Sequence, residues 1–119
     1  MGSTLEKMCC DKISAISTRL VLRRAKGLFD LYLLSGVAGY STINMKFIFE
    51  HSGNTVSNFN EFLNKLSDVE HAYNKLEGIR NKPSFQDVYS RVHYFVSPFI
   101  DGTYKNHNLI WNTRGWIAV

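Results

Sequence analysis

The sequence predicts a mainly all-α protein: a bundle of five or six helices followed by an irregular, aromatic C-terminal tail. Apolar residues recur at three- and four-residue steps over most of the chain, which is the period of an amphipathic helix. Glycines and Ser, Thr or Asn positions separate these stretches, as they do where helices end and begin. With 119 residues, 45% of them hydrophobic and 20% charged, the chain has the size and composition of one globular domain.

Two helices are expected in the first part of the chain. The first begins at a cap formed by Ser3 or Thr4 and ends near Ser17. Its apolar stripe consists of Leu5, Met8, Cys9, Ile13 and Ile16. The second is expected from Thr18 or Arg19 to Leu34, before Gly36. Its buried face is predicted to contain Leu22, Ala25, Phe29, Tyr32 and Leu33.

Further helices are expected downstream. A short one covers residues 43–51, and a longer helical stretch covers residues 57–78 with a break or a new cap at Ser67-Asp68. The last helix begins at Pro83-Ser84, where Ser84 is the predicted cap. Pro98 is expected to kink or end that helix, because proline lacks the N–H that a helix interior needs.

The helical periodicity stops at Gly102. Residues 5–103 are therefore expected to form a helical domain, with residues 104–119 as a tail pinned to it by Trp111 and Trp116. Residues 1–4 are expected to be an initiator methionine with a cloning remnant. No apolar run approaches the ~20 residues of a membrane-spanning helix, and no signal peptide is recognisable. A soluble, cytoplasmic protein without a membrane partner is expected.

Positive charge is concentrated at the start of the chain. Residues 1–26 contain six basic and two acidic residues, which accounts for the whole net charge of +4. Such a stretch attracts phosphate-bearing partners such as nucleotides or RNA, but a solvated helix face has the same composition. Charge alone does not choose between these interpretations.

The residue types that carry chemistry form no complete active site in this chain. It has no phosphate-binding glycine loop and no pair of carboxylates spaced for two-metal catalysis. The adjacent Cys9 and Cys10 are expected to be reduced thiols, at least one of them in the core, because a disulfide between neighbours is strained. The four histidines lack the spacing of metal ligands, so no metal site is predicted.

Two segments nevertheless resemble a known family. Residues 6–15 (EKMCCDKISA), followed by residues 23–34 (RRAKGLFDLYLL), resemble the AbiEii/AbiGii nucleotidyltransferases, the toxins of abortive-infection toxin–antitoxin pairs. Phe85–Val88, Pro98–Ile100 and the two tail tryptophans extend the resemblance over almost the whole chain from Leu5. The resemblance implies that this chain is the C-terminal helical part of such an enzyme. The whole enzyme would transfer a nucleotide from an NTP to an RNA acceptor, tRNA in some members, with Mg²⁺ held by the carboxylates of an N-terminal palm.

The same resemblance implies which residues act. It places a family lysine at Lys12, which would contact the triphosphate, and an aspartate at Asp30, which would orient or deprotonate the acceptor hydroxyl. Nucleotide or RNA phosphates would be bound, together with Lys12, by Arg23, Arg24 and Lys26. Gly27 stands where the family carries another aspartate. The structural alternative is that Lys12 is a surface lysine and that Asp30 pairs with Lys26 or Arg23 on its own helix.

The resemblance also bears on activity and partners. Without the palm, the chain alone is expected to be inactive and to hold no cofactor of its own. Expected partners are an antitoxin protein, RNA, and a second copy of the chain if the surface that would meet the palm is apolar. The alternative function is a non-enzymatic helical module that binds nucleic acid or another protein.

Overall fold

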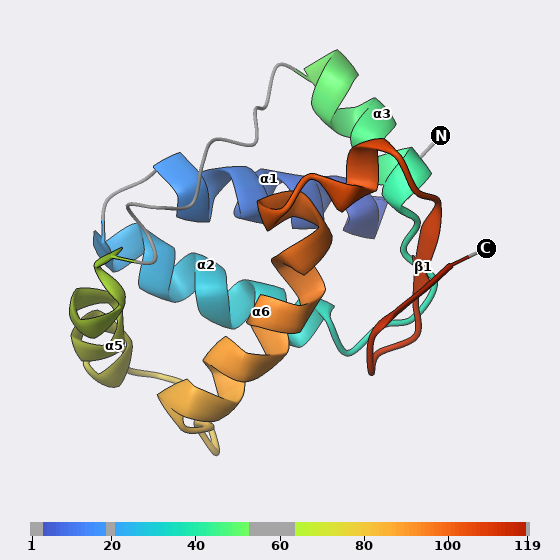
Figure 1. Cartoon of the computed structure of the whole chain (residues 1–119). Helices are drawn as coiled ribbons and strands as arrows, with labels where there is room; N and C mark the ends of the chain where they lie inside the picture. Colours follow the sequence, from blue (N-terminus) through green and yellow to red (C-terminus); the bar gives the residue numbers. More distant parts are fainter. Residues whose placement is uncertain (1–3, 19–20, 53–63, 119) are drawn as a thin grey trace.

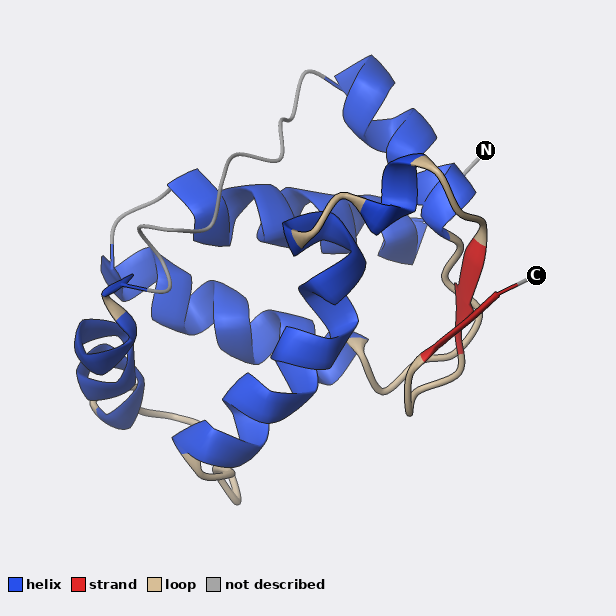
Figure 2. Ribbon diagram, in the orientation of Figure 1, coloured by secondary structure: helices blue, strands red, loops and turns tan. Residues whose placement is uncertain are grey.

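A computed structural model describes residues 4–18, 21–52 and 64–118 of the chain. These residues form five α-helices, one 3₁₀ helix and one two-stranded sheet, so the predicted mainly all-α class is confirmed (Figures 1 and 2). The elements are α1 (Thr4–Thr18), α2 (Val21–Leu34), α3 (Thr42–Ser52), α5 (Leu66–Asn74), α6 (Phe85–Ile100), η1 (Thr103–Lys105), β1 (Leu109–Trp111) and β2 (Trp116–Ala118).

Helix α2 lies at the centre of the bundle. It packs against α1, which runs antiparallel beside it, and against α5 and α6 (Figure 1). Helix α3 packs on α1, and η1 lies between α3 and α6. The β1–β2 hairpin lies at the opposite end of the molecule from α5 (Figure 1). The central position of α2 explains why apolar side chains leave it in several directions.

The predicted apolar stripe of α1 and the predicted buried face of α2 are both only partly right, since Leu5 and Met8 near the start of α1 are exposed. Cys9, Ile13 and Ile16 are fully buried, as predicted. Leu33 was predicted to be buried on α2, but its side chain is 56% exposed. The fully buried residues of α2 include Leu28 and Leu31 instead. Because α2 packs against neighbours on several sides, its apolar residues are not confined to one stripe. Periodicity alone therefore does not predict which face of this helix is exposed.

The predicted helical stretch 57–78 falls partly on residues 53–63, which lie outside the described residues. Its second part is α5, which begins at Leu66, just before the predicted break at Ser67-Asp68. Tyr73 anchors this helix: its side chain is buried, and its hydroxyl donates a hydrogen bond to the Pro83 carbonyl at 2.7 Å. The Lys82 ammonium donates to the carbonyl of Tyr73 in the last turn of the helix and to that of Leu76 just beyond it.

Helix α6 begins as predicted, and its end lies two residues after Pro98, where a kink or an end was predicted. The Ser84 hydroxyl accepts a hydrogen bond from the Asp87 N–H at 3.2 Å, which confirms the cap. Pro98 does not end the helix, which continues to Ile100. A proline leaves the carbonyl four residues earlier without its usual donor. The Ser97 hydroxyl donates to that carbonyl, on Tyr94, at 3.2 Å, so the last turn is retained.

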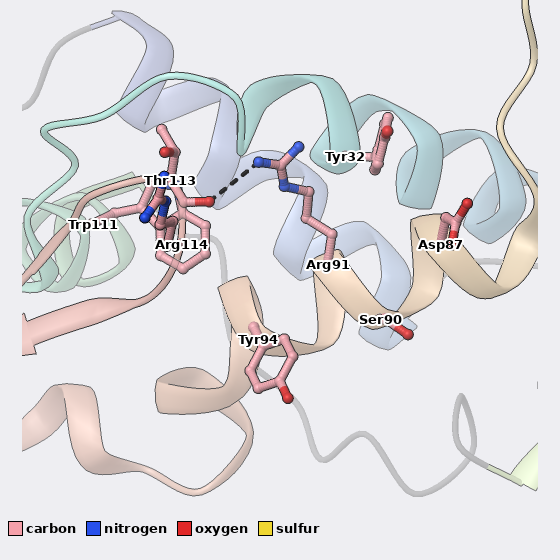
Figure 3. Close-up of a pocket in the computed structure, with 8 residues that line it drawn as sticks. All are labelled: Tyr32, Asp87, Ser90, Arg91, Tyr94, Trp111, Thr113 and Arg114. Carbon is pink, nitrogen blue, oxygen red and sulfur yellow. Dashed lines mark hydrogen bonds between the residues drawn. The ribbon is translucent and has the colours of Figure 1, made fainter.

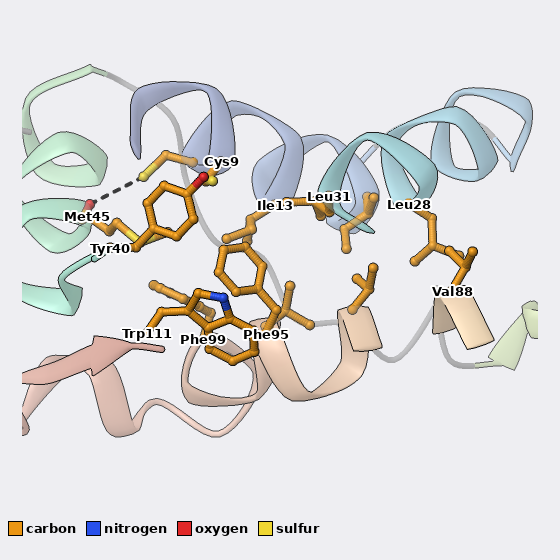
Figure 4. Close-up of a cluster of buried hydrophobic side chains, with 14 of the residues drawn as sticks. Cys9, Ile13, Leu28, Leu31, Tyr40, Met45, Val88, Phe95, Phe99 and Trp111 are labelled. Carbon is orange, nitrogen blue, oxygen red and sulfur yellow. Dashed lines mark hydrogen bonds between the residues drawn. The ribbon is translucent and has the colours of Figure 1, made fainter. Parts of the chain in front are cut away.

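The C-terminal tail is more regular than predicted, because it forms η1 and an antiparallel hairpin that pairs Trp111 with Trp116. The other edge of β1 pairs with residues 39–41: the Trp111 N–H donates to the Tyr40 carbonyl at 2.9 Å. The predicted anchoring by the tryptophans is confirmed. The Trp111 indole donates to the Ser35 carbonyl at 2.8 Å, and the Trp116 indole donates to the Phe95 carbonyl at 2.9 Å. Trp111 also packs edge-on against Phe95 inside the core (Figure 4).

Candidate functional site

The structure brings together the two residues that the family resemblance singled out. The Lys12 ammonium on α1 lies 2.9 Å from Asp30 Oδ2 on α2, which makes an ion pair between the two helices. The pair is partly accessible, with 36% of the lysine side chain and 27% of the aspartate side chain exposed. Asp30 therefore pairs with α1. Among the described residues, the predicted pairing with Lys26 is not found, and the side chain of Arg23, the other predicted partner, lies outside those residues.

A close approach of the two helices places this pair. Gly27 is buried on α2, and a Cβ at this position would lie 3.3 Å from Ile16 Cγ2 on α1. Lys12 stands one turn before Ile16, and Asp30 stands one turn after Gly27. Because the two helices run antiparallel (Figure 1), the contact between Gly27 and Ile16 places Lys12 opposite Asp30. The glycine that departs from the family pattern is thus a packing residue in this chain.

The other predicted phosphate-binding residues are only partly visible. Lys26 is exposed on α2. Arg23 and Arg24 belong to the first turn of α2, but their side chains lie outside the described residues. The structure therefore does not place the two arginine side chains relative to the Lys12–Asp30 pair, whereas Lys26 lies one turn before Asp30 on the same helix.

The two cysteines are packing residues. Both are fully buried and free, which goes beyond the prediction that at least one lies in the core. Burial raises the pKa of the Cys9 thiol to about 12, and a hydrogen bond with Tyr40 offsets only part of this rise. Burial also raises the pKa of Cys10, whose thiol donates to the Met45 carbonyl at 3.6 Å. Since the thiolate is the reactive form, neither side chain is suited to nucleophilic chemistry at neutral pH.

Among the described residues, no group of three or more His, Cys, Asp or Glu side chains is placed to hold a metal ion. Asp30 is a single carboxylate with its Oδ2 engaged by Lys12, so it does not supply the paired carboxylates that the family uses for Mg²⁺. Over the same residues, no helix has both the length and the apolar character needed to cross a bilayer.

A pocket that the sequence did not predict lies between α2, α6 and the hairpin turn (Figure 3). Its volume is about 390 Å³ and it opens to solvent. Arg91 on α6 crosses it and donates a hydrogen bond from Nη2 to the Thr113 carbonyl at 3.2 Å. The Arg91 guanidinium also lies 5.7 Å from the centre of the Tyr32 ring, a cation–π contact. Only the Asn112–Gly115 turn between two apolar triplets signalled this region in the sequence, because it is typical of a hairpin.

Comparisons with known proteins do not assign the chain to a family. No protein-family model matches it, and searches of curated proteins and of solved structures find no match.

Proposed function

We propose that this chain is the helical lobe of an AbiEii-like nucleotidyltransferase. Combined with a palm that carries the Mg²⁺-binding carboxylates, it would help to transfer a nucleotide from an NTP to an RNA acceptor. The observation that supports the proposal is the 2.9 Å ion pair between Lys12 and Asp30. The resemblance selected these two residues from separate segments, and a common site requires them to lie together.

The geometry suits Lys12 for holding phosphate. A lysine ammonium is a compact charge with three rotatable donors, and its long stem lets it turn from one acceptor to another. Lys12 is accessible enough to meet a ligand while Asp30 holds it in place. Asp30 then acts as a positioning residue, because its Oδ2 is already engaged by the ammonium that would face the triphosphate.

Nucleotide binding tests this role. We expect ATP to bind the chain, measured by isothermal titration calorimetry, with affinity at least about tenfold lower in Lys12→Met, since charge-assisted hydrogen bonds contribute ~1.5–3 kcal/mol. Asp30→Asn should weaken binding less, because the ammonium stays. The control is Lys46→Met, which removes the same charge from an ion pair within α3, where the Lys46 ammonium lies 4.0 Å from Glu50 Oε1. Equal losses in Lys12→Met and Lys46→Met, or no binding of ATP, would contradict the proposal.

A catalytic assay tests the second part of the proposal, that transfer requires the palm. Nucleotidyl transfer joins the acceptor oxygen to the α-phosphorus, releases pyrophosphate and removes the proton of the acceptor hydroxyl. We expect no transfer of labelled nucleotide to tRNA by this chain with Mg²⁺ alone. Transfer that Lys12→Ala abolishes would show that the chain is a complete catalyst and would overturn the proposed division into two lobes.

A protein-interaction module is the second candidate. Large apolar side chains are exposed on two helices that pack together: Leu5 and Met8 on α1, and Ile43 and Phe47 on α3. Exposed apolar surface is where a palm, an antitoxin or a second copy of the chain would bind. Light scattering tests for the second copy: a dimer that Phe47→Asp converts to a monomer supports this candidate, and a monomer at every concentration rules out self-association.

A further inference from the structure

The pocket between α2, α6 and the hairpin turn contains the groups needed to bind a phosphorylated nucleoside. Two guanidinium groups line it, Arg91 from α6 and Arg114 from the hairpin turn. Arginine presents a planar set of donors that matches the oxygens of a phosphate or a carboxylate. Among the described residues of the lining, Asp87 is the single acidic side chain, so the formal charge of these residues is positive. An anion is therefore the expected ligand.

The pocket also offers aromatic surface. Tyr32 lies under the Arg91 guanidinium, and Tyr94 stands at the rim of the pocket with 64% of its surface exposed. An exposed phenol ring beside an arginine is a typical platform for a flat, electron-rich ring such as a nucleobase. A simple anion such as phosphate would leave this platform unused.

Asp87 and Ser90 supply the remaining recognition groups. Both lie on α6 with Arg91 and Tyr94, and all four line the pocket (Figure 3). A carboxylate accepts hydrogen bonds, so Asp87 needs donors on the ligand, and the hydroxyls of a ribose or the amino group of a base provide them. A wholly anionic ligand such as an acidic peptide would instead be repelled there.

The Arg91 side chain and the backbone of the turn that carries Arg114 are held in place before any ligand arrives. Thr113, which accepts the hydrogen bond from Arg91, has a φ of 75°, a conformation that a β-branched residue rarely adopts. The Asn112 carboxamide oxygen maintains the turn by accepting hydrogen bonds from the N–H groups of Arg114 and Gly115, at 2.9 and 2.8 Å. Strained backbone that is fixed in this way is concentrated at binding sites, where it orients the groups that meet the ligand.

We infer that this pocket binds a nucleoside phosphate, with the phosphate on Arg91 and Arg114, the base on Tyr94 and the sugar or base donors on Asp87. The volume of about 390 Å³ is near the lower end of the range for ligand pockets and fits one nucleotide. The ligand is either a free nucleotide or one unit of a single strand that passes through the open side. The site is built from other residues than the Lys12–Asp30 pair, so it does not rest on the proposed function.

The test is a titration of the ¹⁵N-labelled chain followed by NMR. The probes are AMP, an eight-residue oligoadenylate, inorganic phosphate and an acidic peptide. We expect AMP or the oligonucleotide to shift the amide signals of the hairpin turn and the indole signal of Trp111, which lines the pocket. If AMP binds, the ligand is a free nucleotide. If only the oligonucleotide binds, the ligand is a single strand. Either result supports the site.

The variants use exposed residues, so that loss of binding does not reflect loss of the fold. Arg114→Glu should weaken binding at least about tenfold, because it replaces a phosphate-binding cation by an anion. Tyr94→Ala should weaken it severalfold through lost stacking. The matched control is Arg80→Glu, which makes the same charge change at an exposed residue outside the pocket lining and should alter affinity less than about twofold.

Three results would overturn the inference. The first is that no probe shifts the signals of the pocket. The second is that inorganic phosphate or the acidic peptide binds as tightly as the nucleotides, which would leave the tyrosine and the carboxylate without a role. The third is that Arg80→Glu weakens binding as much as Arg114→Glu, which would reduce the effect to net charge.

Discussion

Gly27 on α2 faces Ile16 on α1 so closely that a Cβ at position 27 would lie 3.3 Å from Ile16 Cγ2. The helices approach here because glycine has no side chain, and the neighbouring Lys12–Asp30 pair depends on that approach.

We therefore predict that Gly27→Asp destabilises this chain by about 2 kcal/mol or more, because it places a carboxylate against a buried isoleucine. Gly27→Ala is the control. It gains up to ~1 kcal/mol in helix propensity and loses a similar amount by crowding Ile16, so its stability should stay within ~1 kcal/mol of the parent. Urea unfolding measures both. Parental stability of Gly27→Asp would show that packing does not require the glycine.

The buried thiols predict how stability depends on pH. Burial raises the pKa of Cys9 from 9.0 to about 12 in the folded protein and raises that of Cys10 as well. Below pH 9 both thiols are neutral in the folded and the unfolded chain, so they make their full contribution to the free energy of unfolding. As the pH rises above 9, the unfolded chain releases thiol protons that the folded chain retains, so the free energy of unfolding falls, by up to ~1.4 kcal/mol per pH unit for each thiol.

Urea unfolding at pH 8, 9, 10 and 11 checks this dependence. Cys10→Ala should show a smaller fall with pH than the parent, since one titrating group is gone. An equal fall in both proteins would assign the effect to other groups, such as Tyr40, whose pKa burial also raises.

The hairpin should contribute strongly to stability through Trp111. Trp111→Phe leaves the buried Ser35 carbonyl without its donor and removes part of a fully buried ring, so we expect a loss of about 2–4 kcal/mol. Ile117→Ala on the neighbouring strand is the control. This side chain is 53% exposed, and its truncation should change stability by ~0.5 kcal/mol or less. Thermal unfolding compares the two, and a similar effect of both variants would mean that the indole is not the anchor.

Glu6 should act as the link between α1 and the start of α3. Its side chain is only 4% exposed, and its carboxylate accepts hydrogen bonds from the Ser41 N–H at 2.8 Å and from the Asn44 amide at 3.3 Å. Glu6→Ala should cost about 1–3 kcal/mol, because it removes a buried carboxylate that accepts from partly buried donors at a helix N-terminus.

The matched control for Glu6 is Glu50→Ala, which removes an exposed carboxylate paired with Lys46 on α3 and should cost under ~1 kcal/mol. Urea unfolding of the two variants measures the difference. A smaller loss for Glu6→Ala than for Glu50→Ala would show that the link is not important.

The sequence predicted what depends on local pattern. The burial of Cys9, Ile13 and Ile16 on α1 and the Ser84 cap were correct, because each follows from residues close together in the chain. The anchoring role of the two tryptophans was also correct, but the partners that they bind lie far from them in the sequence. The predicted burial of Leu33 was wrong, because the rotation of α2 about its axis depends on neighbouring elements on several sides of the helix. The ordered hairpin was missed, although the Asn112–Gly115 turn between two apolar triplets is a recognisable signal.

Both candidate sites combine residues that are distant in the sequence. Lys12 and Asp30 entered the prediction through the family resemblance, and nothing in their spacing shows that they meet. Their contact depends on the antiparallel packing of α1 and α2 at Gly27. The pocket combines Tyr32, Arg91 and Arg114 from three distant elements, so no local pattern could have joined them.

The bond between Trp111 and Ser35 spans 76 residues of sequence, which has a consequence for biosynthesis. A ribosome makes α2 long before it makes the strand whose indole covers that end of the helix. Until then the aromatic ring of Phe95, once synthesised, lacks the tryptophan that it packs against in the finished molecule. Nascent chains that stop short of residue 111 should expose this hydrophobic surface and be bound by chaperones or degraded by proteases.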